Sequence, residues 1–406
     1  MKDIRPLFGL PVIVAALGYF VDIYDLLLFS IVRIPSLQAL GVAPDALLDK
    51  GEFLLQVQMT GLLIGGVIWG IMGDKRGRLS VLFGSILLYS LANIANGFVT
   101  SVEQYALLRF IAGIGLAGEL GAGITLVSEV LPTRLRGYGT ALVATVGLFG
   151  AVLANFVAKH FDWQTTYFIG GGLGFLLLIA RASVFESGLF MKVKLAAVER
   201  GNFFMLFTNS ARFKRFVGCI LIGLPIWYVI GILITFSPEF AKALGVDGDI
   251  VAGDAVMYSY LALAVGDFSS GFISQIVKSR KKIVLIFILL TLGAIIFYLF
   301  LPFKTVTFFY IACGILGFSI GYWALFVTIA AEQFGTNLRA TVATTVPNFI
   351  RGTVVPITLG FKFLRGEMGI IYGALIVGII TIIIAIIALR SIDETFSREM
   401  NYLEED

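Results

Sequence analysis

Three carboxylates stand inside stretches of the chain that are otherwise apolar. Asp22 and Asp25 lie three residues apart, and Glu119 closes a glycine-rich run. A low-dielectric surrounding favours the protonated form of a carboxylate, and two carboxylates one helical turn apart oppose each other's ionisation. Asp22, Asp25 and Glu119 are therefore candidates for loading and releasing a proton or for binding a ligand. Alternatively, hydrogen bonds between packed helices hold all three in place.

Arg351 is a permanent charge in the middle of another apolar stretch. Its planar guanidinium suits two-pronged recognition of a carboxylate or phosphate, which is strong where water is excluded. The alternative is a buried ion pair with Glu119 or Asp22. The two interpretations are compatible if a ligand displaces the internal acid.

Other polar and aromatic residues in apolar stretches are candidates for lining a cavity. We expect Asn348 and Gln58 to contribute polar contacts. Aromatic residues in such stretches more often serve packing or anchoring at the membrane interface. The aromatic candidates are Trp227, Tyr228, Tyr322 and Trp323.

Composition identifies the elements that position these residues. Of 406 residues, 58% are hydrophobic and 14% are charged, whereas a soluble domain is about half apolar and a quarter charged. About 20 apolar residues cross a bilayer as a helix. Twelve stretches qualify, near 8–33, 53–73, 80–99, 104–130, 138–158, 164–184, 216–238, 251–277, 283–303, 305–331, 338–362 and 368–390.

The basic residues give these spans an orientation. Most of the 30 lysines and arginines fall in the termini and the even-numbered loops, and such loops face the cytoplasm. We therefore predict an integral membrane protein with both termini cytoplasmic, in a bacterial inner membrane. The first span is too long for a cleaved signal peptide.

The spans divide into two repeats. We predict an N-terminal six-helix bundle over 1–184, a cytoplasmic linker with amphipathic helices over 185–215, a C-terminal six-helix bundle over 216–391 and a cytoplasmic tail over 392–406. Glu129 and Arg136 are seven residues apart after span 4, and Glu332 and Arg339 are seven apart after span 10. Parallel repeats of this kind occur in transporters, with the substrate site between the halves.

The loop after span 2 carries a specific motif, Gly70-Ile-Met-Gly-Asp74-Lys-Arg76-Gly77-Arg78. It resembles the signature loop of the major facilitator superfamily in spacing and position. The resemblance implies a twelve-helix fold and a latch that holds the two halves together on the cytoplasmic side. A loop that only anchored the topology would need neither Asp74 nor the glycines.

Two further segments resemble the metabolite/proton symporter, sugar-porter and organic-ion branch of this superfamily. They are Gly18-Tyr-Phe-Val-Asp22-Ile-Tyr-Asp25 in span 1 and Arg109-Phe-Ile-Ala-Gly-Ile-Gly-Leu-Ala-Gly-Glu119 in span 4. The pair Glu129 and Arg136 resembles the charge network of that branch. We expect Arg109, like Glu332 and Arg339, to serve structure or gating.

Several functions are not expected. The chain has a single histidine, and its two cysteines lie in apolar runs, so we expect no metal site and no cofactor. It has no phosphate-binding loop, so we expect no ATP-driven pump, and we expect no enzyme. We also expect no nucleic-acid partner, and a monomer in the lipid bilayer.

The prediction is an all-α membrane protein of two pseudo-symmetric six-helix bundles that acts as a secondary transporter. We expect proton-coupled symport of a small organic anion or zwitterionic metabolite by alternating access. The alternatives are a proton-driven exporter, a uniporter of neutral metabolites, and a membrane sensor that binds a ligand without moving it.

Overall fold

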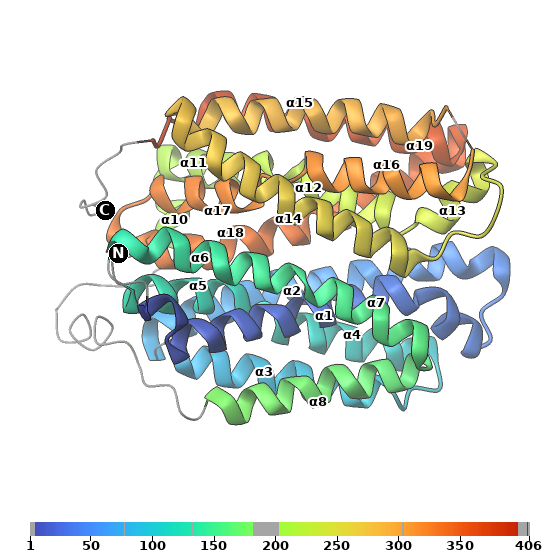
Figure 1. Cartoon of the computed structure of the whole chain (residues 1–406), viewed down its shortest axis with the longest axis horizontal. Helices are drawn as coiled ribbons and strands as arrows, with labels where there is room; N and C mark the ends of the chain where they lie inside the picture. Colours follow the sequence, from blue (N-terminus) through green and yellow to red (C-terminus); the bar gives the residue numbers. More distant parts are fainter. Residues whose placement is uncertain are drawn as a thin grey trace.

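The computed structural model describes residues 5–76, 78–131, 133–181, 203–302, 304–396 and 404, and these are almost wholly helical. The long helices run side by side along the longest axis of the molecule (Figure 1). The predicted all-α architecture is confirmed. Ten helical stretches are long and apolar enough to cross a membrane, and Ser80–Asn96 is a shorter apolar helix.

The N-terminal bundle is built from consecutive helices. A short turn, η1 (Arg5–Phe8), precedes the first, and η2 (Pro44–Ala46) precedes the second. Two spans are each made of two helices, α4 with α5 and α6 with α7. The helices are α1 (Leu10–Ala39), α2 (Leu47–Arg76), α3 (Arg78–Asn96), α4 (Val102–Leu116), α5 (Glu119–Val130), α6 (Thr133–Leu148), α7 (Gly150–His160) and α8 (Trp163–Arg181).

The C-terminal bundle contains more interruptions. Its elements are α10 (Met205–Thr208), α11 (Ser210–Ile222), α12 (Leu224–Tyr228), the π-helical turn η3 (Val229–Ile234), α13 (Ser237–Leu244), α14 (Ala252–Val277), α15 (Arg280–Leu299), α16 (Val306–Ser319), α17 (Trp323–Glu332), α18 (Thr336–Gly352) and α19 (Val354–Ser391). Gly369, with φ 82°, divides α19 into two helices, so the described residues provide the twelve expected spans. Most of the expected amphipathic linker lies outside the described residues, and α11 starts at Ser210, before the predicted position 216.

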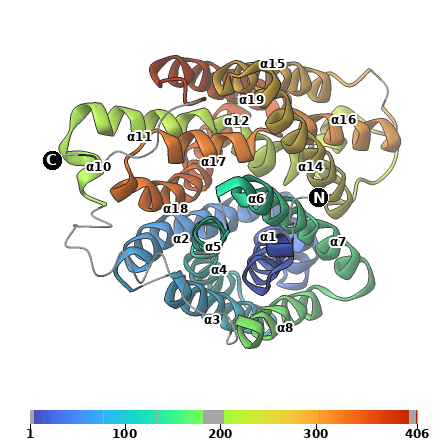
Figure 2. The same cartoon turned by 60° about the vertical axis from the view of Figure 1, so that its left-hand side comes forward.

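The two bundles face each other across one interface (Figure 2). Near the middle of this interface, α2 and α18 approach each other closely because glycines of α2 line the contact. A Cβ on Gly66 would lie only 2.6 Å from Asn348 Cβ. We call the end with the α2-to-α3 turn the α2–α3 end. The opposite end, with the α1-to-α2 turn, is the α1–α2 end.

Glycines also bring helices together within the N-terminal bundle. A Cβ on Gly61 of α2 would lie 2.3 Å from the carbonyl oxygen of Phe110 in α4, and a Cβ on Gly113 would lie 2.2 Å from that of Gln58. Any side chain there would force the two backbones apart. This is the close packing by small residues that membrane helices use in place of the hydrophobic effect.

Candidate functional site

Five residues from both bundles meet at the middle of the interface, and we call them the central cluster. They are Asp22 of α1, Trp227 of α12, Trp323 of α17, and Asn348 and Arg351 of α18. Arg351 Nη2 lies 3.7 Å from Asp22 Oδ2, and both side chains are buried. The Arg351 guanidinium carbon lies 5.7 Å and 5.9 Å from the ring centres of Trp227 and Trp323. A cation beside aromatic faces is attracted by the ring quadrupole.

The hydrogen bonds of the central cluster are incomplete. Neither carboxylate oxygen of Asp22 has a hydrogen-bond partner among the described residues, and the same holds for Arg351 Nε and Trp227 Nε1. Arg351 Nη1 donates only a long bond of 3.4 Å to Asn348 Oδ1. Buried polar groups are nearly always paired, so a group of unpaired ones is a place where water, an ion or a ligand can bind. An anion that reached Arg351 would find free donors.

Helix interruptions position the two tryptophans. Gly223 and Pro225 start α12 anew inside span 7, and α17 starts at Trp323 after a break at Tyr322. Asp267 Oδ1 accepts a hydrogen bond of 3.1 Å from the backbone N–H of Ala324, which fixes the first turn of α17. Asp267 thus holds Trp323 in place.

Asn348 joins the central cluster to the other bundle. Its Nδ2 donates a hydrogen bond of 2.8 Å to the carbonyl oxygen of Ala117, at the break between α4 and α5. It donates another of 3.0 Å to the carbonyl oxygen of Thr344. An interrupted helix leaves carbonyl groups free for such bonds. The three other predicted lining residues also donate to backbone carbonyl oxygens, but they are not part of the central cluster: Tyr228 to Ala374, Tyr322 to Ile222 and Gln58 to Leu26.

Asp25 lies in a second polar group, inside the N-terminal bundle. A Cβ on Gly170 of α8 would lie 2.3 Å from Asp25 Oδ1. Arg109 of α4 and Asn93 of α3 lie near the carboxylate, without a well-formed hydrogen bond to it. Both oxygens of Asp25, and Nε and Nη2 of Arg109, have no hydrogen-bond partner among the described residues. Asp22 and Asp25 therefore face different arginines, although they are one turn apart.

Glu119 is held by a partner that the sequence did not suggest. Arg181, the last residue of α8, donates to both of its oxygens, at 3.0 Å and 2.7 Å, and Ser85 donates at 2.9 Å. A Cβ on Gly18 would collide with Arg181, at 1.9 Å from Nη2. In the sequence, Arg181 contributes only to the positive-inside pattern because it ends a span. This geometry favours the alternative that Glu119 is fixed between packed helices.

We expect Glu119→Gln to destabilise the protein strongly. The amide keeps the shape of the side chain but leaves the buried Arg181 guanidinium without a counter-charge, which costs about 3–5 kcal/mol. Thermal unfolding in detergent measures the loss. The double variant Glu119→Leu/Arg181→Met removes both charges and should recover much of the stability. Wild-type stability of Glu119→Gln would leave Glu119 available for proton coupling.

The predicted latch is described only in part. Gly70 lies at the interface, where a Cβ would be 3.4 Å from Thr345 Cγ2 of α18, and Arg76 is exposed. Glu332, an expected gating residue, forms an ion pair of 2.8 Å with Arg280 at the start of α15. Outside the described side chains lie the latch residues Asp74, Gly77 and Arg78 and the expected gating residues Glu129, Arg136 and Arg339.

Ion pairs join the two bundles at the α1–α2 end. Arg33 of α1 lies 2.6 Å from Glu239 of α13, and Lys159 of α7 lies 2.5 Å from Asp254 of α14. Arg365 of α19 lies 2.9 Å from Asp49 and 3.1 Å from Glu52 of α2. These ion pairs hold the two bundles together on the α1–α2 side of the central cluster.

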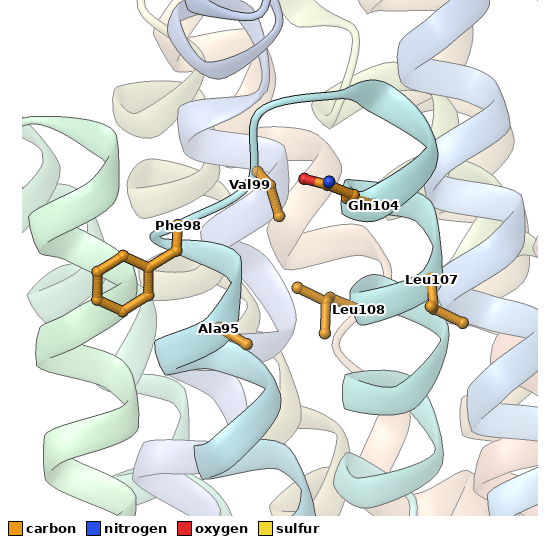
Figure 3. Close-up of a pocket in the computed structure, with 6 residues that line it drawn as sticks. All are labelled: Ala95, Phe98, Val99, Gln104, Leu107 and Leu108. Atoms are coloured by element: carbon orange, nitrogen blue, oxygen red, sulfur yellow. The ribbon is translucent and has the colours of Figure 1, made fainter.

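A surface pocket of about 220 Å³ lies away from the central cluster, between the α1–α2 ends of α3 and α4 (Figure 3). Its lining is nearly all apolar, with Gln104 as the polar exception. Phe98 is 71% exposed and Leu107 60% exposed, as expected for side chains that face lipid tails. We assign it no part in substrate binding. Among the described residues, no group of histidines, cysteines and carboxylates is placed to hold a metal ion.

A family model described as "Major Facilitator Superfamily" matches residues 15–352. The chain belongs to the major facilitator superfamily. As a member of this superfamily, it is a transporter and an integral membrane protein rather than an enzyme.

Individual proteins resemble this facilitator over most of its length. A putative niacin/nicotinamide transporter of Bacillus subtilis is 25% identical over 374 residues, which is 90% of this chain and 86% of the relative. A probable 4-methylmuconolactone transporter of Cupriavidus pinatubonensis is 26% identical over 344 residues, 80% and 76% of the two chains. The structure of the xylose transporter XylE from E. coli in a partially occluded inward-open conformation gives a TM-score of 0.75 at 15% identity, covering 97% of this chain and all of XylE.

Proposed function

We propose that this facilitator imports a small organic anion together with a proton, by alternating access. The observation that carries the proposal is the central cluster, in which Arg351 from one bundle faces Asp22 from the other. A charge pair that bridges the two moving parts and has free hydrogen-bonding capacity is suited to exchange its internal acid for a substrate carboxylate.

The surroundings of Arg351 favour a planar substrate with one carboxylate. The guanidinium can hold the carboxylate with two hydrogen bonds. Trp227 and Trp323 pack edge to face with ring centres 6.3 Å apart, and they place aromatic surface beside the guanidinium. We therefore propose a monocyclic aromatic carboxylate as the substrate class. The names of the two relatives, which refer to small ring compounds, support this choice.

We assign the transported proton to Asp25. Glu119 already has a bidentate partner, and Asp22 lies beside the substrate position, whereas Asp25 has unpaired oxygens inside the N-terminal bundle. We further propose that the α2–α3 end faces the cytoplasm of a bacterial cell, because basic residues concentrate in its loops. The transporter then works as a monomer, with Gly70–Arg78 as the cytoplasmic latch.

Binding of matched ligand pairs tests the substrate class. Two of the four tryptophans in the chain stand in the central cluster, so ligand binding should change intrinsic fluorescence. Nicotinate and benzoate should bind, and nicotinamide and benzamide, which have the same rings without the charge, should bind about 10-fold more weakly or worse. Equal binding of acid and amide would favour a uniporter of neutral metabolites. Binding of the acids without counterflow in proteoliposomes would favour a sensor.

A further inference from the structure

A row of buried hydroxyl groups leads from the Asp25 site to the α1–α2 end. Arg109 Nη1 donates a hydrogen bond of 3.0 Å to the Tyr167 hydroxyl, which lies 2.5 Å from the Tyr105 hydroxyl. The Tyr105 hydroxyl donates a hydrogen bond of 3.3 Å to Ser36 Oγ. Ser36 Oγ in turn donates one of 3.0 Å to the carbonyl oxygen of Arg33. Because Tyr105 gives its single proton to Ser36, Tyr167 is the donor between the two tyrosines. All of these side chains are buried.

The positions of these residues give the row a direction. Ser36 lies in the last turn of α1, Tyr105 in the first turn of α4 and Tyr167 in the second turn of α8, all at the α1–α2 end. Gly170, one turn further along α8 than Tyr167, is the residue that faces Asp25. The row therefore begins in the last turn of α1 and ends at Arg109, whose charge also acts on the Asp25 carboxylate.

We propose that Ser36, Tyr105 and Tyr167 form a relay that delivers the proton from the α1–α2 end to Asp25. The proposal rests on the proposed proton coupling and adds a route that is separate from the substrate position. Hydroxyl groups suit a relay because each can accept one proton while it donates another.

The transfer balances without any redox change. Once the three hydroxyl groups have rotated to donate toward Asp25, Tyr167 passes its hydroxyl proton through water to the Asp25 carboxylate. It takes a proton from Tyr105, Tyr105 takes one from Ser36, and Ser36 takes one from water at the α1–α2 end. Arg109 keeps its proton throughout, and its hydrogen bond stabilises negative charge that develops on the Tyr167 oxygen.

The charged and titratable groups around Asp25 are compatible with this role. They come from α1, α3 and α4, and are Asp22, Tyr24, Tyr89 and Arg109. From α8, Gly170 faces the carboxylate, and Tyr167 is connected to it through Arg109. Among the described residues, Tyr167 continues the connection to a further hydroxyl group, that of Tyr105. The Tyr24 hydroxyl instead ends on the carbonyl oxygen of Thr166.

Tyr105→Phe is the decisive variant, because it breaks the row without touching Arg109 or Asp25. The ring stays, with its edge contacts to Phe29 and Tyr167. In proteoliposomes, we expect the initial rate of nicotinate uptake driven by an imposed pH gradient to fall about 10-fold or more, as for loss of a positioned proton donor. Counterflow of nicotinate between equal-pH compartments, which needs no net proton movement, should stay close to wild type.

Two further variants complete the test. Tyr298→Phe removes a buried hydroxyl that bonds the Leu233 carbonyl oxygen in the other bundle, and should change neither rate. Ser36→Ala breaks the row at its outer link with a smaller change, and should reproduce the Tyr105→Phe effect. Wild-type driven uptake in Tyr105→Phe or Ser36→Ala, or an equal loss of counterflow, overturns the relay. If the wild-type protein shows no uptake driven by a pH gradient, the proposed function itself fails.

Discussion

Arg351→Lys should weaken nicotinate binding by about 10- to 150-fold, the equivalent of about 1.5–3 kcal/mol for a lost charge-assisted hydrogen bond. Lysine keeps the positive charge, so Asp22 retains a counter-ion and the fold should be preserved. What disappears is the planar fork that holds both carboxylate oxygens. Titration of tryptophan fluorescence with nicotinate, on wild type and variant, measures the change.

Arg33→Lys is the matched control for this variant. Arg33 is equally buried and forms an ion pair with Glu239, but at the α1–α2 end. Because distant sites act independently, its nicotinate affinity should stay within about 2-fold of wild type. Near-normal affinity of Arg351→Lys would remove Arg351 from the substrate site and with it the main reason for an anionic substrate.

Asp25→Asn should abolish accumulation of nicotinate driven by a pH gradient. The amide resembles a permanently protonated carboxylate, so the carrier can still change conformation but cannot release a proton. Exchange of substrate between equal-pH compartments should therefore persist at a substantial fraction of the wild-type rate. Paired assays of driven uptake and counterflow in proteoliposomes separate the two outcomes.

Asp22→Asn provides the comparison on the same helix. Asp22 lies beside Arg351, so neutralising it removes the acid that competes with the substrate, and affinity for nicotinate should rise while driven uptake remains. If Asp25→Asn still accumulates substrate and Asp22→Asn does not, the proton resides on Asp22 and the division between the two sites is wrong.

The spans were predictable because each membrane helix needs about 20 apolar residues, a local property of the chain. Their division into two bundles was predictable from the repeated Glu/Arg pairs after spans 4 and 10. Contacts between bundles were not. Asp22 and Arg351 are 329 residues apart, and either of two acids was a reasonable partner for the arginine. Arg181 was missed because an arginine at the end of a span has an evident topological role.

The aromatic candidates show the same limit at a finer scale. Trp227 and Tyr228 are neighbours, as are Tyr322 and Trp323, yet the tryptophans face Arg351 while both tyrosines bond backbone carbonyls. Which of two neighbours faces the interface depends on where the helix restarts, at Gly223 and after Tyr322. Hydropathy alone does not fix the rotation of such short helices.

Accumulation of nicotinate against its gradient tests the central claim most directly. Purified protein in liposomes, with the inside one pH unit more alkaline than the outside, should concentrate radiolabelled nicotinate about 10-fold at one proton per anion, because one pH unit is equivalent to about 1.4 kcal/mol. Liposomes without protein and liposomes with Arg351→Lys correct for passive entry of the neutral acid. A protein-dependent signal that equilibrates without accumulation, or that is unchanged when the pH gradient is collapsed, would contradict proton-coupled import.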